Sequence, residues 1–206
     1  CGDRGRQPAQ VPLPSRSIPK AATGRLTEVV KVKTLLVFAP HPDDAEIFCG
    51  GVILKYLAAG WRVVLVVVTS GNRGHLEIPP EELAEIRRRE AENAAKVAGG
   101  ELVWLGWEDT TIEANLANRN CIIEAIRQVR PDLVLSPDPN DYHSDHRVLG
   151  ELVVNAAYLV GVPLLQTESE ACASPRVYFF ETHGGINFQP EKWMNISFYW
   201  KGNPEN

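Results

Sequence analysis

Two short and almost wholly apolar runs limit what this chain can fold into. The first is Thr34–Ala39 and the second is Arg62–Thr69, with a segment of helical spacing at 46–59 between them. A continuous apolar run of this length indicates a strand that is buried on both faces, as in a parallel sheet covered by helices. The pattern therefore predicts a strand, a turn, a helix and a second strand at the start of an α/β fold.

The remaining sequence continues this alternation of strands and helices. Further strands are expected at 102–105 and 133–136, and further helices at 80–98, 115–130 and 147–159. Strands that alternate with helices predict a Rossmann-like, mostly parallel sheet with helices on both faces, formed by a single domain. The pattern is least clear in the tail at 177–199, where we expect shorter strands.

The N-terminal residues differ from the rest of the chain. Residues 1–24 contain four prolines and no apolar periodicity, which predicts an irregular arm before a domain at 25–206. The longest apolar run, Val63–Val68, is far too short to cross a bilayer, and no leader pattern opens the chain. We therefore expect a cytoplasmic protein without a transmembrane segment, although Cys1 at the first position leaves lipid anchoring open.

Charge and cysteine usage exclude several classes of function. Lys and Arg number 21 and Asp and Glu number 26, so the net charge is −5 and no broad basic surface can attract nucleic acid. The four cysteines are scattered and form no CxxC pair, which argues against a thiolate zinc site and against a dense disulfide framework. Any metal must therefore be bound through nitrogen and oxygen.

Two polar motifs follow two of the expected strands. His41-Pro42-Asp43-Asp44 comes directly after the first strand, and His143-Ser144-Asp145-His146 ends the loop after the fourth. Because the carboxyl ends of parallel strands meet at one edge of a sheet, both motifs are expected at the same rim, together with the loop at 69–74. Three of the five histidines lie in these two motifs.

The residue types in these motifs suit a catalytic zinc ion. Such a site has three protein ligands and an open position for water, and imidazole with carboxylate is a common donor set. His41 and Asp44, three residues apart on a tight turn, are the first two candidates. The third is His143 or His146, between which the residues alone do not decide. Taken singly, each motif also has a simpler interpretation, as a helix-capping turn or as solvated loop histidines.

These motifs, in this order, resemble those of the PIG-L / LmbE-like family of zinc-dependent N-acetylglucosaminyl de-N-acetylases. The resemblance covers most of residues 33–197. The matching stretches are Ala39–Asp44 with Gly50-Gly51, Arg87 with Glu90, Leu105–Asp109, and His143–Arg147. The paired HPDD and HxDH motifs are specific to this family.

The resemblance implies a function and a role for each matching residue. The protein would remove acetyl groups from an N-acetylated amino sugar or glycoconjugate, by attack of a zinc-activated water on the amide. The implied zinc ligands are His41, Asp44 and His146. Asp43 would be the general base, His143 would face the substrate carbonyl, and Asp145 would orient His143. We further expect His143 to be protonated, a form that Asp145 would favour. More loosely, Arg87 and Asp109 would hold sugar hydroxyls, although an exposed helix arginine and a plain loop aspartate are equally good interpretations.

The chain also departs from the family pattern. Ala45 stands where many members have an acid, and Asn195 stands where Asp is common. The second loop reads Gly71-Asn72-Arg73-Gly74 where many members carry Gly-Glu, so an acidic contact to substrate is missing. These departures concern recognition of the sugar more than the zinc chemistry.

Two other functions remain open from the sequence. One is a zinc amidase that acts on another sugar-linked amide. The other is a non-catalytic metal or nucleotide binder, although no GxGxxG follows the first strand and no GxxxxGK[ST] occurs. The sequence is also compatible with a homo-oligomer.

Overall fold

In the described part of the chain, five strands form one parallel sheet. The computed structural model describes residues 32–182 and 188–200. The strands are β1 (Thr34–Ala39), β2 (Arg62–Thr69), β3 (Glu101–Trp107), β4 (Leu133–Pro137) and β5 (Arg176–Phe180). Their spatial order is β3-β2-β1-β4-β5, and every neighbouring pair is parallel. The expected fold class, a Rossmann-like α/β sheet, is confirmed.

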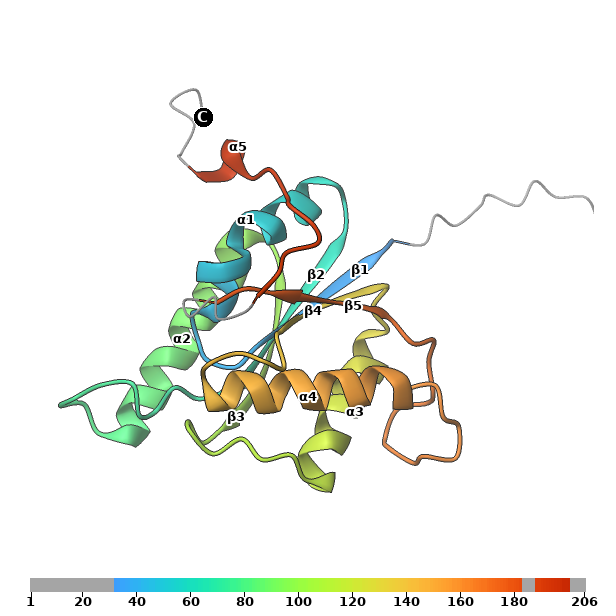
Figure 1. The fold of residues 1–206 in the computed structure, drawn as a ribbon. Coiled ribbons are helices and arrows are strands. Elements are labelled where there is room, and N and C mark those ends of the chain that lie inside the picture. Colours follow the sequence, from blue (N-terminus) through green and yellow to red (C-terminus); the bar gives the residue numbers. More distant parts are fainter. Residues whose placement is uncertain (1–31, 183–187, 201–206) are drawn as a thin grey trace, which may run out of the picture. The chain divides into compact units, whose positions relative to one another are not determined.

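Helices cover both faces of this sheet (Figure 1). One face packs on α1 (Asp44–Ala58) and α2 (Pro80–Ala98), and the other packs on α3 (Leu116–Val129) and α4 (Ser144–Leu159). Successive strand residues point to opposite faces, so all six residues of β1 are buried. Each fully buried Val, Leu or Ile contributes about 1.5–3 kcal/mol. None of the helices in the described segments combines the length and hydropathy that a membrane span needs.

The order of the strands reverses beside β1. The chain runs from β1 through β2 to β3 in one direction and then returns to place β4 on the other side of β1. In open α/β sheets, ligands bind beyond the carboxyl ends of the strands at this kind of switch point. The loops that follow β1 and β4 are the two that carry the HPDD and HSDH motifs. The topology therefore brings both motifs to one crevice.

Gly150 lets α4 approach the end of β4 closely. A Cβ added at this position would lie 2.7 Å from the Pro137 carbonyl oxygen and 2.9 Å from the Pro139 nitrogen. Both atoms belong to the backbone, so the loop itself would have to move to accept a side chain. Gly150 lies one turn after His146 on the buried side of α4. Its lack of a side chain therefore helps to set the position of His146 relative to β4.

The structure differs from the sequence-based prediction at two helix starts and in the tail. The first helix begins at Asp44 rather than at 46, and the fourth begins at Ser144 rather than at 147. Where the tail is described, at 177–182 and 188–199, it forms one strand, β5, and then a short helix, α5 (Ser197–Trp200), so the expectation of several strands was wrong for these residues. The aromatic residues of α5 favour strands, but packing of the tail on α1, with Lys55 bonded to the Asn195 carbonyl, overrides that preference. The expected arm at 1–24, with its boundary to the domain at 25, lies outside the described residues.

Candidate metal centre

The HPDD motif forms a tight turn between β1 and α1. The Asp43 N–H donates to the His41 carbonyl at 3.0 Å, and the His41 N–H donates to Asp44 Oδ2 at 2.8 Å. Asp44 is therefore held against His41 by the backbone of its own turn, and it is only 5% exposed. The backbone of Asp43 has a φ of 148°, which residues other than glycine rarely adopt, and its side chain is exposed.

The HSDH motif forms the start of α4. His143 caps the helix, because its Nδ1 accepts a hydrogen bond from the Asp145 N–H at 3.3 Å. His146 lies in the first turn of the helix and is 4% exposed. The same helical turn thus places the two histidines three residues apart, and their rings lie 5.0 Å from each other, centre to centre.

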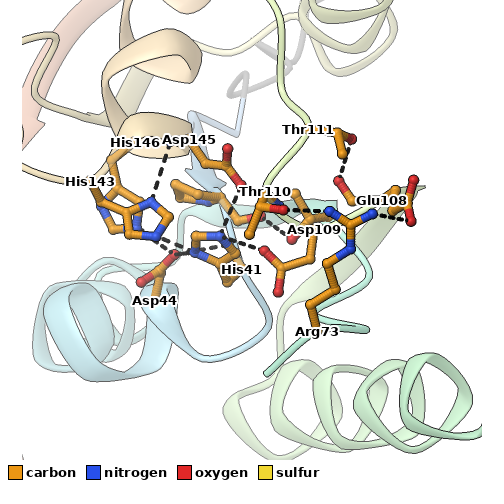
Figure 2. A network of polar contacts seen from close by, with 12 residues as sticks. His41, Asp44, Arg73, Glu108, Asp109, Thr110, Thr111, His143, Asp145 and His146 are labelled. Atoms are coloured by element: carbon orange, nitrogen blue, oxygen red, sulfur yellow. Dashed lines mark hydrogen bonds and ion pairs between the residues drawn. The ribbon is translucent and has the colours of Figure 1, made fainter. Parts of the chain in front are cut away.

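Three donor atoms from the two motifs form a nearly equilateral triangle. His41 Nδ1 lies 3.2 Å from Asp44 Oδ2, His146 Nε2 lies 3.4 Å from the same oxygen, and the two nitrogens lie 3.3 Å apart. Figure 2 shows these side chains turned toward one another. In a tetrahedral zinc site with bonds of about 2.0–2.1 Å, neighbouring ligand atoms lie about 3.3 Å apart. The triangle therefore fits one face of a zinc tetrahedron, with the fourth corner open.

Two further groups of side chains lie close enough to hold a metal. Within the described residues, His41, His143 and His146 have ligand atoms within 4.8 Å of one another, and so do His41, Asp109 and Asp145. His41 belongs to both groups because its two ring nitrogens face different neighbours. The first group shares His41 and His146 with the triangle and differs only in replacing Asp44 with His143.

Two carboxylates lie behind His41. Its Nε2 is 3.2 Å from Asp145 Oδ2 and 3.2 Å from Asp109 Oδ1 (Figure 2). Metal-binding histidines usually donate their second ring N–H to a carboxylate, which fixes the ring and leaves the other nitrogen free for the metal. The contacts of His41 fit this arrangement, with Nδ1 on the metal side.

Sequence reasoning missed a similar carboxylate behind His146. Asp141 Oδ2 lies 3.3 Å from His146 Nδ1, and it also accepts a hydrogen bond from the Thr182 hydroxyl. Both Asp141 and Thr182 are buried. The acidic loop before α4 was visible in the sequence, but the contact with Thr182 depends on β5 lying beside β4, which the sequence pattern did not predict.

The acidic surroundings keep His41 positively charged and Asp44 negatively charged. Burial lowers the pKa of His41, but contacts with Asp109 and Asp44 outweigh this effect and raise the pKa to about 10. Burial raises the pKa of Asp44, but contacts with His146 and His41 outweigh it and hold that pKa well below its ordinary value. A cation that replaces the His41 proton would find an ionised carboxylate beside it.

The structure corrects two expectations about His143. Burial lowers its pKa, as do the charges of His41 and His146. The charges of Asp145 and Asp109 raise it, as we expected of Asp145, but the net shift of the pKa is downward, away from the expected protonated form. The Asp145 carboxylate was expected to orient His143, but it accepts instead from Thr110 N–H at 2.9 Å and faces His41. Asp145 contacts His143 through its backbone N–H, which donates to Nδ1. That bond places the proton of neutral His143 on Nε2, where it can still be donated.

Asp43 lies beside the triangle without being part of it. Asp43 is exposed as a whole, but partial burial of its carboxylate and the neighbouring Asp44 carboxylate raise its pKa, although the positive charges of Arg87 and His41 oppose the rise. A carboxylate with a raised pKa takes up a proton more readily than an ordinary one. Its position and its pKa therefore suit a group that accepts a proton.

The two expected sugar-binding residues lie in different environments. Arg87 extends toward the rim, where a Cβ on Gly71 would lie 3.6 Å from its Cγ, while its guanidinium pairs with Glu90 at 3.1 Å. Its neighbours Arg88 and Arg89 pair along the exposed side of α2 instead. Asp109 is 7% exposed, and its carboxylate faces His41. The structure thus brings Arg87 near Asp43 and places Asp109 behind a candidate ligand.

Comparisons with known proteins find relatives with similar sequences. The family profile described as PIG-L, GlcNAc-PI de-N-acetylase, matches residues 36–157. The chain is 36% identical over 138 residues to the diacetylchitobiose deacetylase of Thermococcus kodakarensis, a match that covers 64% of this chain and 52% of that protein. It is 25% identical over 178 residues to the 4-oxalmesaconate hydratase of Pseudomonas putida, covering 82% of this chain and 69% of that protein.

A solved structure of a deacetylase is also similar to this chain. The N,N'-diacetylchitobiose deacetylase of Pyrococcus horikoshii, in complex with an inhibitor, superposes with a TM-score of 0.68 and 31% sequence identity. The superposition covers 73% of this chain and 61% of that protein. The chain thus spans about half to three fifths of the length of these deacetylases.

Proposed function

This chain belongs to the PIG-L family, and from that premise we propose that it is a zinc-dependent hydrolase that deacetylates an N-acetylglucosamine-type sugar or conjugate. The observation that carries the proposal is the triangle of His41 Nδ1, Asp44 Oδ2 and His146 Nε2, with edges of 3.2–3.4 Å and with Asp43 beside it. Deacetylases are among its relatives, including one that is 36% identical. A metal-dependent amide hydrolase needs such a metal seat, meaning the ligands that hold the ion, and a proton acceptor at the same rim.

We propose that His41, Asp44 and His146 hold the zinc ion. Zinc in such a seat supplies Lewis acidity and makes water acidic enough to react near neutral pH. Asp109, Asp145 and Asp141 would keep the two imidazole rings in place from behind, through the contacts at 3.2–3.3 Å. Asp109 is then a supporting residue as well as a candidate for sugar binding.

The remaining rim residues would carry the proton transfers and the charge. Asp43 accepts a proton from the attacking water and later delivers it to the leaving amine, which its raised pKa favours. His143 donates from Nε2 to the amide oxygen as negative charge develops there, because its Nδ1 is already occupied by the Asp145 N–H. Arg87, on the same rim, is the first candidate to bind a sugar hydroxyl.

The proposal is tested by measuring acetate release from the zinc-loaded protein. The substrates are GlcNAc, diacetylchitobiose, GlcNAc-malate and GlcNAc-inositol, each compared with the Asp43→Asn variant. We expect acetate from at least one of them, and none above background from the variant. No acetate from these four, together with release of a larger acid from sugars that carry a longer N-acyl group, would indicate an amidase that acts on another sugar-linked amide. Zinc binding without hydrolysis of any substrate would instead support a non-catalytic metal binder.

A second candidate activity is the addition of water to an unsaturated acid. It is favoured by the likeness to the 4-oxalmesaconate hydratase of Pseudomonas putida, which covers more of this chain than the likeness to the Thermococcus kodakarensis deacetylase does. The same metal seat and proton acceptor could serve both reactions. Loss of the ultraviolet absorbance of a conjugated oxo acid, with no acetate from the sugars, would identify the hydratase.

Zinc binding is expected to release a proton and to weaken as the pH falls. Because the pKa of His41 is raised to about 10, metal-free His41 carries a proton at neutral pH, whereas zinc needs the neutral ring. This group alone should weaken the apparent affinity roughly tenfold for each unit of pH below its pKa. Ionised Asp44 has no proton to lose.

Calorimetry in two buffers with different enthalpies of ionisation measures the number of protons released. An Asp109→Asn variant is the control, because removal of this negative charge should lower the pKa of His41 and reduce the release. Zinc binding at neutral pH without proton release would contradict the assigned role of His41.

A further inference from the structure

The loop after β2 is fastened to the loop after β3 by two neighbouring residues. Arg73 donates through Nη1 to Thr110 Oγ1 at 2.6 Å and through Nη2 to Glu108 Oε1 at 2.5 Å. Asn72 Oδ1 accepts from the Asp109 N–H at 3.0 Å. These residues form the segment that departs from the family pattern, with Asn72 and Arg73 in place of an acid. The Arg73 guanidinium thus contacts residues of the protein itself, in the loop after β3.

Thr110 has a conformation that needs such support. Its φ is 65°, in the left-handed region, where a β-branched residue is a rare outlier. In this conformation its N–H donates to Asp145 Oδ2 at 2.9 Å, while its hydroxyl accepts from Arg73 (Figure 2). Strained residues of this kind persist where surrounding contacts hold them. Arg73 and Asp145 contact Thr110 from opposite sides.

A continuous set of contacts leads from Arg73 to the metal seat. Asp145 is 1% exposed, and the oxygen that accepts from Thr110 also lies 3.2 Å from His41 Nε2. Loss of the Thr110 N–H would leave that buried oxygen with fewer donors and would free the carboxylate to rotate. The side chain of Arg73 itself contacts none of the candidate ligands in the described contacts.

We propose that Arg73 is a positioning residue that holds Thr110 in its strained conformation, so that the Thr110 amide fixes Asp145 behind His41. The role is to keep the His41 ring oriented for the metal. The expected effect on zinc affinity rests on the proposed zinc seat. The expected effect on kcat rests also on the proposed hydrolase activity. In this role Arg73 affects the reaction through its contacts with Thr110 at Nη1 and Glu108 at Nη2, and not by binding the substrate.

The chain offers a closely matched control at the other end of the same two strands. Arg62 on β2 pairs with Glu101 on β3 at 2.7 Å, with side chains 40% and 55% exposed. Arg73 and Glu108 lie just beyond the opposite ends of these strands, with side chains 44% and 55% exposed. An Arg62→Met variant removes a similar surface ion pair far from the rim. Any effect confined to Arg73→Met is therefore not a general effect of losing such a pair.

The experiment measures zinc affinity by chelator competition and steady-state kinetics at saturating zinc. In Arg73→Met we expect zinc affinity and kcat each to fall about tenfold with KM unchanged, as for loss of outer contacts at a metal site. Arg73→Lys should not restore them, because one ammonium cannot bridge the two acceptors as the guanidinium fork does. Arg62→Met should keep the wild-type zinc affinity and kcat. A raised KM with unchanged kcat would overturn the proposal, because it would make Arg73 a substrate contact.

A double-mutant cycle tests the role of Thr110. Glycine adopts positive φ without strain, so in a Thr110→Gly background Arg73→Met should reduce zinc affinity little further. Equal losses in the two backgrounds would overturn the proposal, as would an unchanged zinc affinity in Arg73→Met alone. The zinc measurements need no substrate. If the wild-type protein binds zinc but hydrolyses nothing, the proposed hydrolase fails while the effect of Arg73 on zinc affinity is still measured.

Discussion

An Asp43→Asn protein is expected to bind zinc as the wild type does but to lose roughly 10²–10⁴-fold in kcat, the usual contribution of a positioned acid or base. Asp43 lies next to Asp44 in sequence, yet it is outside the triangle of donor atoms and has a raised pKa. Asparagine is the better replacement than alanine because Asp43 has a φ of 148°, and asparagine tolerates positive φ more readily than alanine does. The measurements are zinc content and acetate release.

Glu46 supplies the matched control for this variant. It lies three residues further along the chain and is exposed as a whole, but partial burial of its carboxylate raises its pKa, as do the charges of Asp43 and Asp44. Glu46→Gln should keep both zinc and activity, since in the described part of the chain no side-chain hydrogen bond or ion pair joins Glu46 to His41, Asp44 or His146. An Asp43→Asn protein that loses zinc and activity together would show that Asp43 is a ligand or a structural residue, and not the base.

The alternation of apolar runs and helices was sufficient to predict the fold and the meeting of the two motifs. β1, β2 and α2 begin and end at the predicted residues, because buried strands and a helix bounded by Pro80 and Gly99 leave strong signals. Parallel strands end at one edge whatever their order, so the shared rim followed without knowledge of the strand order. The order β3-β2-β1-β4-β5 then shows why these two loops are neighbours across the crevice.

What the sequence pattern could not predict depends on contacts between distant segments. Arg127 shows this best: an arginine on a helix is ordinarily exposed, but here it is 2% exposed, and its N–H groups donate to the carbonyls of Val160, Val162 and Leu165, among others. Asp145 likewise faces His41 rather than its own helix neighbour His143. Both outcomes are decided by loops that no local periodicity describes.

His146→Gln and His143→Gln are expected to differ sharply, although the two residues share one helical turn. His146 Nε2 lies 3.3 Å from His41 Nδ1 and 3.4 Å from Asp44 Oδ2, and His146 is backed by Asp141, so its loss should abolish stoichiometric zinc binding and with it activity. His143 is the N-cap of α4, and within the described residues its Nε2 makes no hydrogen bond, so that this nitrogen can donate. Its loss should leave zinc bound and lower kcat by roughly 10²–10³-fold, as for other donors to a developing oxyanion.

Asp44→Asn decides between the two ligand sets that share His41 and His146. If the triangle is the metal seat, this variant loses most of its zinc affinity, because a neutral amide replaces the carboxylate whose oxygen lies 3.2–3.4 Å from both imidazoles. If His143 were the third ligand, as in the group of three histidines within 4.8 Å, Asp44→Asn would keep zinc and His143→Gln would lose it. The triangle is favoured because its edges match those of a zinc tetrahedron. It also leaves Nε2 of His143 available to donate to the amide oxygen, since Nδ1 accepts from the Asp145 N–H.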